Sequence, residues 1–208
     1  MELVYSRQRE QQKSVEIDDR ELAVRARGGD MVAFETLVLR KTPAVVSVAR
    51  RIIGDAEEAR DVAQLVFLRV WDSIARYDEK YSFNTWLYRI ATNLSIDFLR
   101  ANRSRAKAHG ATLHLVERRE AALEDEATFA LESSQVAELF ERVSCDLSEK
   151  QKAAFVLREI DGLDSKDVAE ILGCGESTVR NHLFNARKSL QKKLRRDFPK
   201  LFQRWSKA

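Results

Sequence analysis

Glycine and proline are scarce in this chain, and their scarcity constrains the fold more than any other feature of the sequence. Seven glycines and two prolines interrupt 208 residues, while alanine, leucine, arginine, glutamate and lysine are abundant. Those five residue types favour helices, whereas sheets favour β-branched and aromatic side chains. The sequence therefore predicts an all-α protein. No apolar run approaches a membrane span, and the first 19 residues lack the apolar core of a signal peptide, so we expect a cytoplasmic protein.

Capping signals divide the first half of the chain into helices. Asp30 precedes the first helix, Pro43 kinks or divides it, and Gly54 ends it. Asp55 opens the second helix, and a polar loop separates the second from the third. The three expected helices span residues 31–54, 56–77 and 83–103. Apolar residues recur along the third helix and predict a buried stripe of Phe83, Leu87, Ile90, Leu94 and Phe98.

Helical periodicity weakens in the middle of the chain and divides it into two small domains. Charges of both signs crowd residues 104–131, which we interpret as a flexible or partly helical linker. In the second helical set, Ser148 and Gln151 form a capping box, and Gly162 ends the helix that they open. The prediction is a flexible N-terminal segment, a first domain, a linker, a second domain and a basic tail, at residues 1–17, 18–103, 104–131, 132–194 and 195–208.

Residues 165–186 have the spacing of a DNA-binding helix-turn-helix. Val168 and Leu172 point inward from the first helix, and Ala169 is small enough for a second helix to cross closely. Gly173 allows the sharp turn between the two helices. The second helix carries a narrow apolar stripe of Val179, Leu183, Ala186 and Leu190.

The opposite face of this second helix is polar and basic, and docking on a core does not require it. In the major groove, arginine pairs with guanine and asparagine with adenine, while serine and threonine reach bases or phosphates. Phe184 either meets a thymine methyl group or packs against a neighbouring helix. From Arg180 to the end, ten cations accompany a single acid, so we expect a polyanion partner. The candidate reading residues are Ser177, Thr178, Arg180, Asn181, Phe184, Arg187 and Lys188.

Three segments resemble functional segments of bacterial sigma factors, in the order that the family has them. DAEEARDVAQLVFLRVW, at 55–71, looks like the helix that binds core RNA polymerase. FNTWLYRIATNLSIDFLRANRSR, at 83–105, looks like the helix that reads the minus-ten promoter element. Residues 147–190 look like the domain that reads the minus-thirty-five element. Residues 18–194 therefore resemble an extracytoplasmic-function sigma factor, which keeps only sigma regions 2 and 4.

The first of these segments leaves an unusual set of side chains facing outward. Two exposed leucines beside an acid and an amide indicate a protein-docking patch, unless they pack against another helix of the same domain. The resemblance assigns this patch to the clamp helices of the largest polymerase subunit. The family usually has glutamate where this chain has Leu65, which weakens a charge contact or shifts docking towards apolar burial. The candidate polymerase-binding residues are Asp61, Gln64, Leu65 and Leu68.

An aromatic cluster around a polar loop predicts the site of promoter melting. Unstacked bases are captured in pockets or on aromatic rings, beside cations that follow the backbone. By resemblance, the loop at 81–84 receives a flipped non-template base and the helix after it contacts the minus-ten element. Core packing is the alternative for Phe83 and Trp86, and a structural hydrogen bond is the alternative for Asp97, which we expect near the buried edge. The candidates are Tyr81, Ser82, Phe83, Asn84, Trp86, Arg89, Asn93, Asp97 and Arg100.

The sequence contains no plausible catalytic constellation or phosphate loop, so we expect neither an enzyme nor a cofactor. His109, His114 and His182 are paired with no nucleophile or carboxylate at a recognisable spacing. Cys145 and Cys174 stand alone, which predicts buried thiols without a disulfide or a metal site.

The alternatives to a sigma factor are a stand-alone helix-turn-helix regulator and a sigma mimic that titrates an anti-sigma factor. Such a regulator carries an α/β domain upstream, and this first half shows no strand pattern. A mimic needs no basic reading residues, whereas Arg180 and its basic neighbours are present. For a sigma factor, the expected partners are core RNA polymerase, promoter DNA and, from the family, an anti-sigma factor. His182 and Asn185 stand at positions often basic in the family, so direct readout is expected to depend more on Arg180 and Asn181.

Overall fold

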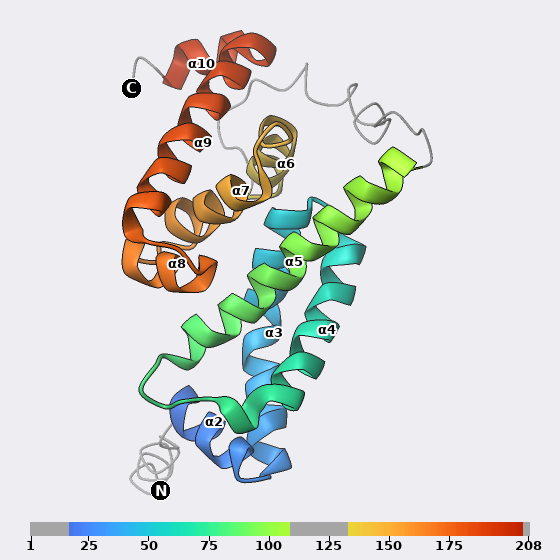
Figure 1. Ribbon diagram of the computed structural model, residues 1–208. Coiled ribbons are helices and arrows are strands. Elements are labelled where there is room, and N and C mark those ends of the chain that lie inside the picture. Colours follow the sequence, from blue (N-terminus) through green and yellow to red (C-terminus); the bar gives the residue numbers. More distant parts are fainter. Residues whose placement is uncertain (1–16, 109–132, 206–208) are drawn as a thin grey trace, which may run out of the picture.

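The structure is a computed structural model that describes residues 17–108 and 133–205, and within these ranges every regular element is a helix (Figure 1). The first domain contains α2 (Asp19–Arg27), α3 (Met31–Ile53), α4 (Ala56–Ser73), the 3-10 helix η1 (Ile74–Arg76) and α5 (Phe83–Ala108). The second contains α6 (Ser133–Val143), α7 (Glu149–Phe155), the π-helix η3 (Val156–Ile160), α8 (Ser165–Leu172), α9 (Glu176–Asp197) and α10 (Pro199–Trp205). The all-α prediction is confirmed. None of the described helices is long and apolar enough to cross a membrane.

Side-chain caps begin the helices where the sequence predicts them. The Asp30 carboxylate accepts a hydrogen bond from the third residue of α3 at 3.0 Å, and the Asp55 carboxylate accepts two from the first turn of α4. Gly54 ends α3 with a φ of 89°, a left-handed conformation that glycine adopts without strain. Ser148 and Gln151 form the expected capping box at α7. Local chemistry therefore sets these boundaries.

The first domain buries one face each of α2, α3, α4 and α5 in a shared core. On α5 only part of the predicted stripe is fully buried: Phe83 and Leu87 are inside, whereas the side chains further along the stripe are partly exposed. A second face of α5, which includes Ile96, packs against the second domain instead. The buried stripe of α4 comprises Ala59, Val62, Ala63, Val66 and Val70.

The second domain contains the helix-turn-helix in α8 and α9. Gly173 ends α8 with a φ of 61°, which gives the tight turn that the sequence predicts. Val168 and Ala169 are buried between the two helices. All four residues of the α9 stripe are buried, namely Val179, Leu183, Ala186 and Leu190. α9 therefore packs against the rest of the protein along this one face.

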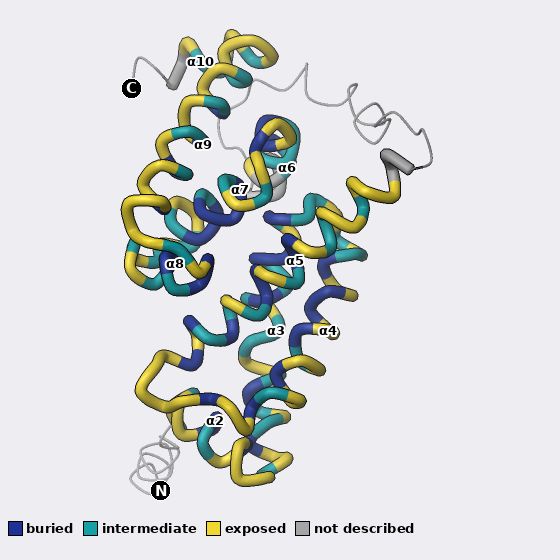
Figure 2. The backbone as a smooth tube through the Cα atoms, in the orientation of Figure 1, coloured by how far each residue is buried: buried dark blue, intermediate teal, exposed yellow. Residues whose placement is uncertain are grey.

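The two domains pack directly against each other through a shared apolar cluster. Val48 and Ile52 of α3 and Ile96 of α5 lie in one buried cluster with Val156 and Leu157 of the second domain. Figure 2 shows buried stretches on α3 and α5 of the first domain and on α7 and α8 of the second. In Figure 1, α7 and α8 lie beside α5, and α7 also contacts α3. We call this arrangement of the two domains the closed form.

Ion pairs surround the apolar contact between the domains. Arg51 Nη1 of α3 lies 2.5 Å from Asp161 Oδ1, just after η3. Arg103 Nη1 of α5 lies 2.6 Å from Glu149 Oε1 at the start of α7. Both pairs join residues of different domains, so opening of the closed form would break them.

Several boundaries differ from those expected. Pro43 lies inside α3, which continues through it undivided. α5 runs to Ala108, whereas the linker was expected to start at residue 104. The last turn of α5 lacks the apolar periodicity on which the expected boundary was based. α9 and α10 occupy part of the expected tail, and α10 contributes Leu201 to a small apolar cluster with α6 and α9. Residues 1–16 and 109–132, which include most of the expected N-terminal segment and linker, lie outside the described residues.

Candidate nucleic-acid and polymerase interfaces

The outward face of α9 presents a continuous row of polar and basic side chains. Phe184 is 64% exposed on this face, so it does not pack against a neighbouring helix. A π-rich side chain in this position is free to contact a base or a thymine methyl group. The other candidate reading residues are all exposed as well: Ser177, Thr178, Arg180, Asn181, Arg187 and Lys188. The structure therefore leaves the whole predicted reading set accessible.

The reading face is partly preorganised by its own contacts. Arg187 pairs with Glu159 at 2.7 Å, which holds one cation close to the protein. The Asn185 amide donates a hydrogen bond to the Asn181 side-chain oxygen at 3.1 Å. Within the described part of the chain, Arg180 and Lys188 form no ion pair and remain available. Burial lowers the pKa of His182, and the nearby Lys150 cation acts in the same direction, so His182 is favoured as a neutral side chain.

The outward face of α4 carries the predicted docking patch. Leu65 is 53% and Leu68 61% exposed, and Asp61 and Gln64 are exposed beside them. The alternative, in which these side chains pack against another helix of the domain, is therefore wrong. Trp71 extends the patch by one turn, with its ring 4.8 Å from that of Phe34. We did not single out Trp71 from the sequence, although its spacing of three from Leu68 was a signal for it.

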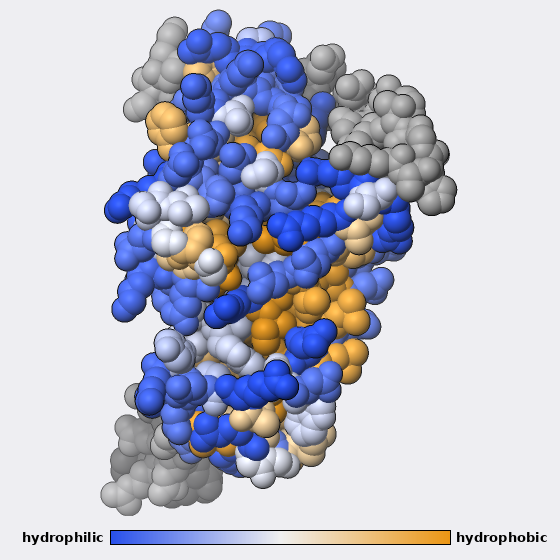
Figure 3. Space-filling view, viewed as in Figure 1, coloured by the Kyte–Doolittle hydropathy of each residue, from blue (hydrophilic) through white to orange (hydrophobic). Residues whose placement is uncertain are grey.

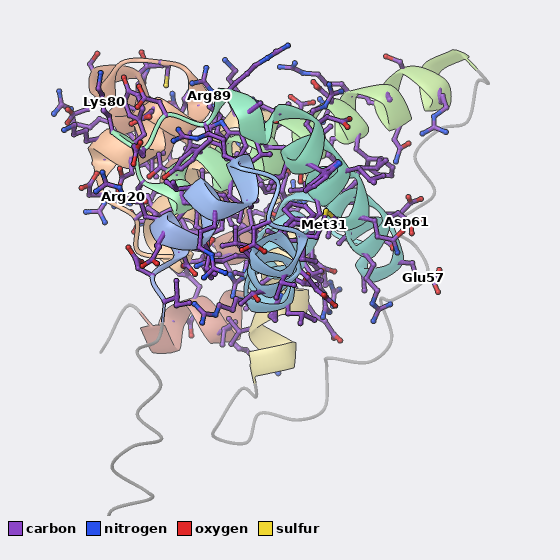
Figure 4. All side chains as sticks on the ribbon, turned by 90° about the horizontal axis from the view of Figure 1, so that it is seen from below. Arg20, Met31, Glu57, Asp61, Lys80 and Arg89 are labelled. Carbon is purple, nitrogen blue, oxygen red and sulfur yellow. The ribbon has the colours of Figure 1, made fainter. Side chains whose placement is uncertain are left out.

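In the space-filling view, apolar side chains gather right of centre, over the part of the first domain formed by α4 and α5 (Figure 3). A contiguous apolar surface of this kind on a charged protein marks an interaction site more often than chance exposure does. Figure 4 shows that Glu57 and Asp61 of α4 lie far from Arg20, Lys80 and Arg89.

The loop between η1 and α5 is backed by buried aromatic rings. Phe83 is buried against Tyr77 with ring centroids 5.6 Å apart, and Trp86 is half-buried 5.4 Å from the same ring. Phe83 supports the loop from within and offers no surface to a base, so the core alternative holds for it. Tyr81, in contrast, is 54% exposed, with Ser82 and Asn84 exposed on either side of Phe83. The loop thus presents one aromatic ring and two small polar groups to solvent.

The polar residues of α5 form an exposed row after the loop. Arg89, Asn93 and Arg100 are exposed, as a DNA-reading surface requires. Our expectation that Asp97 lies near the buried edge is wrong, because its side chain is exposed and lies 3.6 Å from Arg100 in an ion pair. An exposed pair of this kind contributes little to stability.

No group of three or more His, Cys, Asp or Glu side chains among the described residues could hold a metal ion. Cys145 and Cys174 are free thiols. The expectation that both thiols are buried is wrong: Cys145 is exposed, next to the Lys193 ammonium group at 2.7 Å, and Cys174 is half-buried.

Comparison with known families explains why these surfaces occur together. The family model described as Sigma-70 region 2 matches residues 37–105, and the model described as Sigma-70, region 4 matches residues 137–190. The RNA polymerase sigma-H factor of Pseudomonas aeruginosa is 33% identical over 183 residues, which cover 85% of this chain and 93% of the relative. The ECF RNA polymerase sigma factor SigW of Bacillus subtilis is 32% identical and covers 80% of this chain and 91% of the relative.

The chain belongs to the extracytoplasmic-function sigma factors. A solved structure of CnrH in complex with the cytosolic domain of CnrY is 25% identical to this sigma factor and superposes with a TM-score of 0.64, covering 86% of this chain and 98% of that chain. The sigma factor RpoE from Bartonella quintana, solved with the anti-sigma factor NepR, shares the fold at 23% identity and a TM-score of 0.58, covering 79% and 98% of the two chains. This sigma factor functions in promoter-directed initiation of transcription.

Proposed function

We propose that the sigma factor carries out initiation with three separate surfaces, one on each of α4, α5 and α9. The observation that carries this proposal is that each helix leaves one face exposed, and that the exposed face of α4 differs in chemistry from those of α5 and α9. The face of α4 is acidic and apolar around Asp61 and Leu68, whereas those of α5 and α9 are polar and cationic. An apolar face with a few charges suits a protein partner, and a cationic face suits DNA.

In this proposal the α4 patch docks on core RNA polymerase. Leu65 and Leu68 would lose water on docking, while Asp61 and Gln64 would provide the polar contacts that fix the orientation. Leu65 replaces the glutamate that the family usually has, so we propose an interface in which apolar burial contributes more than a charge contact at this position.

The loop before α5 and the exposed row of α5 would open and read the minus-ten element. Tyr81 offers a ring on which an unstacked base can stack, and Ser82 and Asn84 offer hydrogen bonds to its edge. Arg89, Asn93, Asp97 and Arg100 would contact the rest of the element, with the cations following the backbone. Phe83 and Trp86 would support this surface from below.

The exposed face of α9 would read the minus-thirty-five element. Arg180 and Asn181 lie in the first half of the helix, which enters the major groove in a helix-turn-helix. Arg187 and Lys188 lie further along and would hold phosphates once Arg187 leaves Glu159.

Contact with both promoter elements requires the closed form to open. The two elements lie about 25 base pairs apart, which is about 85 Å at 3.4 Å per base pair. A compact chain of this length has a radius of gyration of only about 17 Å, so the closed form cannot span that distance. We propose that binding to polymerase separates the domains.

An anti-sigma factor belongs to this proposal as a protein partner, because the sigma factor RpoE from Bartonella quintana was solved with the anti-sigma factor NepR. The site of action would be the cytoplasm, where RNA polymerase works. The sigma factor would supply no catalytic group and no cofactor, because the polymerase carries out the synthesis.

Run-off transcription tests the proposal directly. Core polymerase with this sigma factor should initiate at specific sequences selected from a library with randomised minus-ten and minus-thirty-five segments. Polymerase with the Asn93→Ala variant should form closed promoter complexes with normal affinity. The thymines of the melted region should then react more weakly with permanganate than they do with the parent protein. Initiation without sequence preference, or normal melting by this variant, would contradict the assignment of α5.

A further inference from the structure

The helix α2 lies outside the segment that matches the region 2 model, which begins at residue 37. Its apolar side chains are nevertheless buried in the core of the first domain, with Leu22 and Ala23 inside. This packing places α2 beside η1 and α5. The base-capture loop, which we define as residues 77–84, runs from the end of η1 into the first turn of α5. The helix is therefore a fixed part of the domain that the loop belongs to.

Arg27 at the end of α2 binds the start of the base-capture loop at two points. Its Nη1 donates a hydrogen bond to the Tyr77 carbonyl oxygen at 3.0 Å, in a partly buried position. Its Nη2 donates to Glu79 Oε1 at 3.3 Å. The planar guanidinium group fixes the directions of both hydrogen bonds as well as their lengths, and a lysine ammonium group in its place would not do so.

Tyr77 binds the other end of the same loop. Its hydroxyl group donates a hydrogen bond to the Tyr81 carbonyl oxygen at 2.9 Å, and its ring, 2% exposed, packs against Phe83 and Trp86. Burial raises the pKa of this hydroxyl group, so it remains a protonated donor at neutral pH. Between these ends, Asp78 closes a turn by accepting hydrogen bonds from the backbone N–H groups of Lys80 and Tyr81, each at 3.0 Å.

We propose that Arg27 and Tyr77 are positioning residues that hold the base-capture loop in the conformation that accepts an unstacked base. This inference rests on the proposed function of the loop. Arg27 fixes the carbonyl group where the loop begins, and Tyr77 fixes the carbonyl group of Tyr81, next to the exposed Ser82. A loop held in advance loses less conformational entropy when the base enters, and its polar groups stay aligned with one base edge. Through the contacts of Arg27 with the loop, α2 therefore contributes to base selection, and these contacts do not involve DNA.

The test compares four full-length variants with core polymerase on templates that carry each of the four bases at the captured position. Tyr77→Phe keeps the ring and removes only the hydroxyl hydrogen bond, and Arg27→Lys keeps the charge and loses the two-point contact. Each should slow open-complex formation on the preferred template about two- to tenfold, the range expected for one hydrogen bond. The preference among bases should shrink by the same factor, with closed-complex affinity unchanged. Arg25→Lys is the matched control, because Arg25 lies on the same helix and pairs with Asp30 away from the loop. Ser82→Ala is the fourth variant.

The outcomes separate the two proposals. If Tyr77→Phe and Arg27→Lys behave like Arg25→Lys while Ser82→Ala slows melting, the positioning role is overturned and the loop function stands. If Ser82→Ala also melts promoters normally with its base preference intact, the function of the loop itself is overturned. If Arg27→Lys slows melting equally at all four bases and lowers the melting temperature, Arg27 is a structural residue and the inference fails.

Discussion

Replacement of Arg51 by alanine is expected to shift the sigma factor from the closed form towards a form with separated domains. The Arg51 guanidinium group is the hydrogen-bond donor to Asp161 Oδ1. The other carboxylate oxygen, Oδ2, is buried and has no hydrogen-bond partner among the described residues. Loss of Arg51 therefore leaves a carboxylate with 17% of its side chain exposed and without its ion-pair partner.

The expected magnitude follows from this geometry. Removing one partner of a fully buried ion pair costs about 3–5 kcal/mol, and this pair is only partly buried, so we expect about 1–3 kcal/mol. That energy raises the ratio of open to closed molecules by about 5- to 160-fold, at 1.36 kcal/mol per factor of ten. Asp161→Asn should act differently. Burial raises the pKa of Asp161 despite the opposing effect of Arg51, so the ionised carboxylate is net disfavoured in the closed form, and its neutral counterpart should leave the closed form intact.

Single-molecule energy transfer between the domains measures the two populations. Dyes at cysteines introduced at the exposed positions Glu35 on α3 and Gln191 on α9 report the separation, with Cys145 and Cys174 replaced by serine. The Arg51→Ala variant should show a larger low-transfer population than the parent.

The double variant with Arg51→Ala and Asp161→Asn provides the control, because it removes both charges of the pair. It should return most of the way to the parent distribution. Equal populations in Arg51→Ala and the parent, or an equally large opening in Asp161→Asn, would refute the reasoning from an uncompensated carboxylate.

The remaining predictions concern the three surfaces, the pH dependence of closure and one cap. Leu68→Ala should weaken binding to core polymerase about 5- to 30-fold with unchanged circular dichroism, and an unchanged affinity would place docking elsewhere. Arg180→Ala should cost about 1–3 kcal/mol at one base pair and relax preference there, whereas Lys192→Ala should weaken all sequences alike and flatten the plot of log affinity against log salt by about 0.9. The raised pKa of Asp161 means that the closed form should gain stability as the pH falls through that pKa, and Asp161→Asn should remove this dependence in the energy-transfer assay. Ser148→Ala should lower the unfolding free energy by about 1 kcal/mol in urea titrations, because it removes the capping box of α7.

Local features of the fold were predictable because they depend on neighbours in the sequence. Asp30 and Asp55 cap helices through atoms two or three residues away, and Gly173 allows a turn wherever it occurs. The exposure of Leu65 and Leu68 followed from the period of 3.6 residues once the buried stripe of α4 was known. The functional roles of these residues remain predictions.

Features that depend on distant segments could not be predicted. Ile52 and Ile96 read as ordinary apolar positions, and nothing in their spacing indicates that they bury against the second domain rather than their own. Asp97 looked like an edge residue because the periodicity of α5 does not show which of its faces the second domain covers. The contact between Arg27 and the loop could not be predicted from the sequence, because its partner Tyr77 lies 50 residues away along the chain.

Lys152 lies at the boundary between the domains with only 8% of its surface exposed. A Cβ atom added at Gly54, the end of α3, would lie 3.9 Å from its ammonium group. Burial lowers the pKa of Lys152, and the charge of Glu141 offsets only part of this effect. Domain separation would return both this cation and the Asp161 carboxylate to water. The hydration free energy of these two groups offsets part of the free energy that opening costs by exposing apolar surface. The cost of separating the domains is lowered by this hydration. A partner that prefers either form by about 1.4 kcal/mol changes their ratio tenfold. A lower cost of separation means that a partner needs a smaller preference for one form to change which form predominates.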